Sequence, residues 1–118
     1  MEIKTHEINS IKMAEVVAGE IVITDAITGL ELMVDLYYQG FDGIIINEKN
    51  ITPEFFDLKT RIAGELLQKF SNYRVRLVIV GDFEKYHSNS LKDFIFESNK
   101  GRLTNFVSSI ANLSTLQF

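Results

Sequence analysis

The chain has 118 residues, of which 46% are hydrophobic and 24% are charged, a composition typical of one globular domain rather than of a disordered segment. Twelve Lys and Arg stand against 16 Asp and Glu, so the formal net charge of -4 provides no overall positive field to attract nucleic acid or anionic lipid. The sequence contains no cysteine, which excludes disulfides, thiolate nucleophiles and sulfur-ligated metals. We expect a single domain over residues 1–118.

The first residues, MEIKTHEINSIK, carry charges where a secretory signal peptide needs an apolar core, and no apolar run approaches the ~18 residues of a membrane span. The basic residues Arg74, Arg76, Lys100 and Arg102 are scattered, as is typical of a solvated surface. We therefore expect a cytoplasmic protein that binds neither nucleic acid nor membranes.

The N-terminal segments are expected to form strands. Residues 3–8 and 12–17 are short half-alternating runs, and Gly19 separates the second from the apolar run 20–24, which indicates a hairpin. Apolar side chains then recur at helical spacing through about Tyr38, after Thr24 or Asp25 as a cap.

The middle of the chain predicts a strand, a long helix and a second strand. Residues 43–47 are a continuous apolar run, the mark of a strand that is covered on both faces. Thr52 caps a helix that extends to about residue 70, with Pro53 in the first turn, where the missing N–H costs nothing. Residues 76–80 form the second buried strand.

The last third of the chain predicts a helix, a strand and a terminal helix. Ser88 or Ser90 begins a helix that Gly101 is placed to end, residues 104–107 form a short strand, and Ser108 opens the terminal helix. The complete order is β-β-α-β-α-β-α-β-α. This alternation implies right-handed crossovers and an α/β fold with a mostly parallel sheet and an antiparallel N-terminal edge.

Three segments, FFDLKTRIAGELLQKF, NYRVRLVIVGDF and SLKDFIFESNKGR, closely resemble the bacterial domain-of-unknown-function family 4180. The resemblance covers roughly residues 26–107 and is weaker in the tail SSIANLSTLQF. It implies a family but no chemistry, because that family has no established activity to carry over.

The order of elements is also similar to that of STAS-like domains, typified by bacterial anti-sigma-factor antagonists, in which a buried strand leads into a polar loop that carries a phosphorylatable serine. The corresponding loop here is Asn47-Glu-Lys-Asn-Ile-Thr52, without the paired serine motif. Thr52 is the nearest hydroxyl, and Pro53 after it favours a helix cap over a phosphorylation site.

Lys59 is oddly placed, because on a helical wheel it falls on the apolar side between Leu66 and Phe70. One interpretation is that its stem lies along the apolar arc while the ammonium reaches solvent. The other is that it pairs with Glu48 or Asp82 at the carboxyl ends of the strands, where open α/β sheets bind ligands.

The second interpretation predicts a ligand or partner site that consists of Asn47, Glu48, Thr52, Asp57, Lys59 and Asp82. The carboxylates show no defined acid–base pair, and Asp57 can instead form a helical ion pair with Arg61. His6 and His87 lack a third ligand at regular spacing, so no metal is expected. No glycine-rich phosphate loop occurs, and no cofactor is expected.

Two features point to contacts with another chain. Gly64 lies in mid-helix, where glycine costs about 1 kcal/mol relative to alanine, so we expect the sheet, another helix or a second subunit to approach it closely. Phe96 falls off the apolar side of its helix, and with Tyr86 it forms a candidate self-association surface. A homodimer is therefore one hypothesis.

The leading hypothesis is a small regulatory or protein-interaction domain of STAS-like type that acts by binding a partner protein, with enzymatic activity left open but not favoured. The alternative is a small-molecule-binding or enzymatic domain that uses Lys59, Glu48 and Asp82 at the strand ends. A purely structural dimer is the third hypothesis.

Overall fold

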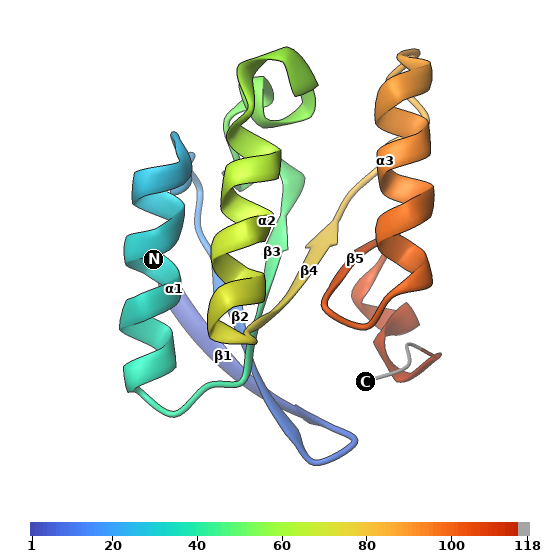
Figure 1. Cartoon of the computed structure of the whole chain (residues 1–118). Coiled ribbons are helices and arrows are strands. Elements are labelled where there is room, and N and C mark those ends of the chain that lie inside the picture. Colours follow the sequence, from blue (N-terminus) through green and yellow to red (C-terminus); the bar gives the residue numbers. More distant parts are fainter. Residues whose placement is uncertain (116–118) are drawn as a thin grey trace.

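The computed structural model describes residues 1–115 and contains one five-stranded sheet whose strands lie side by side in their chain order (Figure 1). β1 is antiparallel to β2, and every later pair is parallel, which confirms the predicted mostly parallel sheet with an antiparallel N-terminal edge. The strands are β1 (Glu2–Ile8), β2 (Ile11–Val17), β3 (Gly43–Asn47), β4 (Arg76–Val80) and β5 (Thr104–Val107).

The N-terminal hairpin joins β1 to β2 through Asn9 and Ser10. Both residues have positive φ, 52° and 68°, as a two-residue turn between antiparallel strands requires. The hairpin expected around Gly19 is therefore misplaced, because residues 20–24 contribute only a bridge between Ile23 and Ile51.

The first helix, α1 (Ala26–Tyr38), begins as predicted at Asp25. The Asp25 carboxylate accepts a hydrogen bond from the Thr28 N–H, and the Thr28 hydroxyl accepts one from the Asp25 N–H, which completes a capping box. After the helix, Gly40 adopts φ +94°, a conformation that favours glycine.

The long helix predicted from Thr52 is wrong in its first half. The chain instead makes three short 3-10 turns, η1 (Glu48–Asn50), η2 (Pro53–Phe56) and η3 (Leu58–Thr60), before α2 (Ile62–Tyr73) begins. The Asp57 carboxylate caps η3, and the Thr60 hydroxyl donates to the carbonyls of Glu54 and Asp57. These local bonds compete with helical ones, and Arg61 at φ +67° separates η3 from α2.

The third helix, α3 (Asn89–Lys100), is capped by Ser88 and ends at Gly101, as predicted. The terminal helix expected from Ser108 is the 3-10 segment η4 (Ile110–Thr115), and residues 116–118 of that prediction lie outside the described residues. All three α-helices contribute to one core on one face of the sheet, whereas Leu113 of η4 packs on the opposite face with Met13 and Val78.

Candidate functional site at the carboxyl ends of the strands

Glu48 joins the end of β3 to the loop that follows β4. Its side chain is only 11% exposed, and its Oε1 accepts a hydrogen bond from the Asp82 N–H at 3.0 Å. Its Oε2 lies 3.0 Å from Lys85 Nζ and accepts a longer bond from the Tyr86 hydroxyl at 3.3 Å. A carboxylate that is nearly buried needs such partners. Glu48 therefore links the end of β3 to the loop after β4, and together these segments form the rim at the carboxyl ends of the strands.

Gly81 makes the close approach of Glu48 possible. A Cβ atom at this position would lie 2.5 Å from Glu48 Cγ and 2.7 Å from its Cδ, closer than packed atoms permit. The Asp82 carboxylate then holds the loop by accepting a hydrogen bond from the Glu84 N–H. At the end of β4, Gly81 thus leaves space for the Glu48 side chain and the Asp82 N–H donates a hydrogen bond to it.

The titration of two neighbours reflects this arrangement. The hydrogen bond to Glu48 is the main cause that raises the pKa of Lys85, against a smaller opposing effect of desolvation. Burial is the main cause that raises the pKa of Tyr86, and the Glu48 charge adds to it. Both groups therefore keep their protons to higher pH than they would in an unfolded chain.

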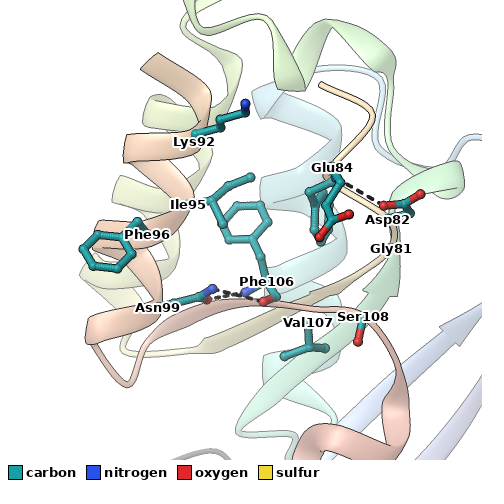
Figure 2. A pocket seen from close by; sticks show the side chains of 11 residues that line it. Gly81, Asp82, Glu84, Lys92, Ile95, Phe96, Asn99, Phe106, Val107 and Ser108 are labelled. Carbon is teal, nitrogen blue, oxygen red and sulfur yellow. Dashed lines mark hydrogen bonds between the residues drawn. The ribbon is translucent and has the colours of Figure 1, made fainter. Parts of the chain in front are cut away.

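The rim carries two hollows, one on each side of the Glu48–Gly81 contact. The larger, about 650 Å³, lies between α3 and the ends of β4 and β5. Figure 2 shows Ile95 and Phe106 at its centre, Lys92 on the α3 side, and Asp82 and Glu84 on the opposite wall.

The smaller hollow, about 370 Å³, lies beside β3 and is lined by Asn47, Glu48, Lys49, Lys85 and Tyr86 among others. The larger hollow is therefore mainly apolar with charged edges, and the smaller one has a greater polar share in its lining.

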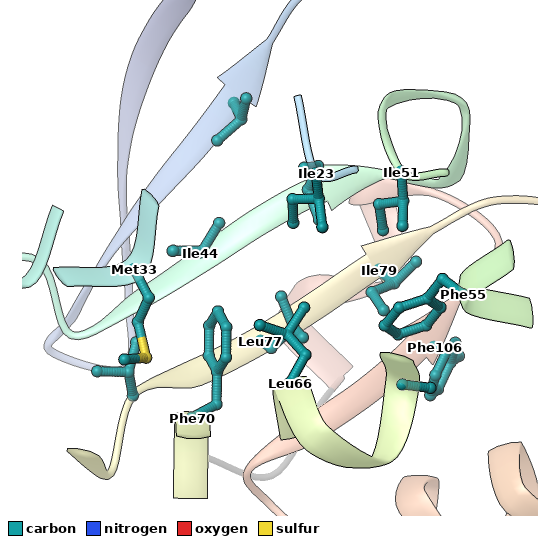
Figure 3. Close-up of a cluster of buried hydrophobic side chains, with 14 of the residues drawn as sticks. Ile23, Met33, Ile44, Ile51, Phe55, Leu66, Phe70, Leu77, Ile79 and Phe106 are labelled. Carbon is teal, nitrogen blue, oxygen red and sulfur yellow. The ribbon is translucent and has the colours of Figure 1, made fainter. Parts of the chain in front are cut away.

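The loop that carries Glu48 is anchored in the core. Ile51 and Phe55 are almost fully buried, and Figure 3 shows both beside Ile79 of β4. The Phe56 ring stacks on the Tyr86 ring, with the centroids 5.1 Å apart. It also meets the Phe55 ring edge to face, with the centroids 5.0 Å apart. The rim is thus held by packing as well as by hydrogen bonds.

Asn99 of α3 satisfies the outer edge of β5. Its side-chain oxygen accepts the Phe106 N–H at 2.7 Å, and its amide donates to the Phe106 carbonyl at 3.1 Å (Figure 2). One side-chain amide thus replaces the neighbouring strand that an edge strand lacks.

α3 is the least buried of the three α-helices. Leu91 is its one buried residue, whereas α1 and α2 each bury three. Phe96 is 63% exposed, and Lys100 Nζ lies 4.6 Å from the centre of its ring. An aromatic side chain is therefore displayed on the solvent face of α3.

The predicted site residues divide into three groups. Glu48 and Asp82 are brought together, as the parallel strands imply. Asn47, Thr52 and Asp57 each cap one 3-10 turn by accepting a backbone N–H. Lys59 is exposed on η3, and the Glu48 carboxylate pairs with Lys85 instead; the helical phase that placed Lys59 on an apolar side does not apply to a 3-10 turn.

The two residues of the predicted self-association surface lie in different surroundings. Tyr86 donates to Glu48 and stacks on Phe56, so its ring serves the rim. Phe96 is exposed, in agreement with its helical phase.

Sequence reasoning missed Lys85 and Asn99. Lys85 lies in a loop without periodicity, and the role of Asn99 depends on a strand that follows it in sequence. The polar side chain two residues before Gly101 was the only local signal.

No part of residues 1–115 approaches Gly64 closely, because a Cβ atom there would have no neighbour within 4 Å. The expectation that the sheet or another helix contacts it is wrong. It lines a third hollow of about 660 Å³ with Leu58, Arg61 and Phe94.

His6 pairs with Glu15 across the hairpin at 2.7 Å. Within residues 1–115, no three His, Asp or Glu side chains are grouped so as to hold a metal ion. In the same part of the chain, no helix has the length and apolar character needed to cross a membrane.

Residues 8–116 match the family described as Domain of unknown function (DUF4180), and because this match spans most of the sequence, the chain belongs to that family. The match extends further than the resemblance over residues 26–107 and includes most of the tail. No curated protein and no solved structure matches the chain significantly.

Proposed function

We propose that the chain is a cytoplasmic regulatory or protein-interaction domain of STAS-like type, which binds a partner protein through α3 and the larger hollow beside it. The observation that carries the proposal is the exposure of Phe96 on a helix that buries only Leu91. Large exposed aromatic side chains beside an apolar hollow are typical of protein interfaces.

The polar groups of the rim support this choice of surface. Glu48 uses both oxygens within its own chain, and Asn47, Thr52 and Asp57 cap turns. Groups that are already hydrogen-bonded have less to offer a ligand. The Thr52 hydroxyl accepts the Glu54 N–H at 3.4 Å, which supports a capping role rather than the phosphorylated serine of the antagonists.

A capture experiment tests the proposal. The tagged chain is used as bait in an extract of its source organism, with Phe96→Glu as the variant and Ile27→Glu as the matched control, because Ile27 is 69% exposed on α1. We expect a stoichiometric partner with wild type and the control but not with Phe96→Glu. Capture of neither another protein nor an untagged copy of the chain, or equal capture by all three proteins, would contradict the proposal.

The second candidate function is small-molecule binding or catalysis at the smaller hollow. The observation that favours it is the convergence of Lys49, Lys85, Glu48 and Tyr86 around about 370 Å³ at the strand ends, where α/β proteins bind ligands. Lys85 now takes the role that was predicted for Lys59.

A thermal-shift screen of metabolites tests this candidate, because a ligand that binds the folded state raises the melting temperature. Lys85→Met is expected to abolish the shift and Lys59→Met to leave it unchanged. A screen without any hit, or a hit that Lys85→Met does not affect, would count against this candidate.

A further inference from the structure

We propose that the partner that α3 binds is a second copy of this chain, in a two-fold dimer in which Phe96 of each copy enters the larger hollow of the other. This inference rests on the proposed function and specifies its partner. A two-fold interface requires a surface that is complementary to itself, and the α3 side of the molecule has this property.

The first complementary pair is apolar. At 100° per residue, Phe96 projects about 140° away from Leu91 around α3, and it stands at the edge of the hollow with its ring on the outer side of the helix (Figure 2). The hollow, with Ile95 and Phe106 at its centre, has about 650 Å³, which is ample for an aromatic side chain, since drug-sized ligands occupy roughly 300–1,000 Å³. The ring and the hollow are therefore a knob and a hole on the same face.

The second complementary pair is electrostatic. Phe96 is flanked along α3 by Lys92 and Lys100, whereas the far wall of the hollow ends in Asp82 and Glu84 (Figure 2). None of the ion pairs among residues 1–115 involves Lys92 or Glu84, whereas the Asp82 charge already acts on Lys85. When Phe96 enters the other copy, its lysines approach carboxylates, and the two-fold axis repeats the contact.

The hollow and its edge form the centre of the proposed interface. One side of a stable interface contains roughly 20–30 residues, of which the 11 residues that line the hollow would be the middle part. A second copy supplies a ring, a hollow and both charges of its own, so a two-fold dimer makes the same contact twice.

Charge reversal provides a sharp test, because the proposed contact pairs Lys92 of one copy with Glu84 of the other. Glu84→Lys alone and Lys92→Glu alone each turn both symmetric contacts into repulsions. An equimolar mixture of the two single variants restores both contacts in a heterodimer, and the double variant restores both in a homodimer.

Sedimentation velocity over a range of concentrations measures the result. We expect wild type, the Ile27→Glu control and the double variant to dimerise, and each single charge variant to dimerise at least about tenfold more weakly. Phe96→Glu, at the centre of the interface, should weaken the dimer by about 30-fold or more. Thermal unfolding of each variant verifies that these exposed substitutions leave the fold intact.

Two results would overturn this inference: a wild type that sediments as a monomer at high micromolar concentration, or a dimer that the charge variants weaken without recovery in the mixture and the double variant. A monomeric wild type that still captures a different protein through Phe96 would overturn the self-association and leave the proposed function standing. A monomer that captures nothing would overturn both.

Discussion

Replacing Gly81 with alanine tests whether Glu48 joins β3 to the β4–α3 loop. Gly81 does not have positive φ, so alanine is allowed by the backbone. Its Cβ atom would, however, lie 2.5 Å from Glu48 Cγ, in the middle of a side chain that is held at its far end. Gly81→Ala must therefore displace Glu48.

The expected cost follows from the bonds that Glu48 makes. A hydrogen bond to a charged group contributes roughly 1.5–3 kcal/mol, and the bonds from the exposed Asp82 N–H and the long bond from Tyr86 belong at the lower end of that range. We expect Gly81→Ala to lower the free energy of unfolding by about 2–3 kcal/mol, and Glu48→Ala to lower it by about the same amount, because both substitutions remove the same bonds.

The double variant is the decisive case. Once Glu48 is alanine, the methyl group at position 81 has room, so the second substitution should cost nothing further. The coupling energy between the two sites should therefore be about 2–3 kcal/mol, within the range known for contacting residues.

Urea denaturation followed by far-ultraviolet circular dichroism measures all four proteins, with Gly19→Ala as the control, because a Cβ atom at Gly19 meets nothing within 4 Å. Additive effects, within about 0.5 kcal/mol, would refute the role assigned to Glu48.

Three further predictions follow from single contacts. Because the pKa of Lys85 and of Tyr86 is raised in the folded state, their contribution to stability is complete below about pH 10 and is lost at higher pH; urea denaturation at pH 9 and 11 should show a larger loss in wild type than in Tyr86→Phe, and equal losses would contradict this. Asn99→Ala should lower the free energy of unfolding by about 1–2 kcal/mol and speed hydrogen exchange of the Phe106 amide, and unchanged exchange would show that the edge of β5 is protected otherwise. Gly64→Ala should raise the free energy of unfolding by about 0.5–1 kcal/mol, since nothing approaches the new methyl group; a destabilised variant would reveal a close contact.

The elements that sequence reasoning placed correctly are those with local signals. The isoleucines of β3 and the LVIV run of β4 indicate buried strands, because both faces of the sheet are covered. Asp25 marks the start of α1, where it forms a capping box with Thr28. The covered faces also explain why a continuous apolar run, rather than an alternating one, was the correct pattern.

The break before α2 was not predictable from periodicity. Phe55, Leu58 and Ile62 keep helical spacing although the chain makes separate 3-10 turns, since each apolar side chain still points to the core. Nothing in the sequence indicates that Arg61 has a positive φ, which is the angle that separates η3 from α2. The direction of the parallel strands was enough to predict that Glu48 and Asp82 lie close together. The cation beside them, Lys85, lies on a loop without periodicity, so helical phase pointed to Lys59 instead.

The match between strand order in the sheet and strand order along the chain bears on how the protein forms during synthesis. Each new strand pairs with the strand made just before it, so each pairing closes only the crossover segment between two consecutive strands. Assembly can therefore advance from the N-terminal hairpin toward β5 as the polypeptide leaves the ribosome. At every stage before β5 the growing edge exposes unpaired backbone, and Asn99, which emerges just ahead of β5, is the residue that ends this vulnerable period.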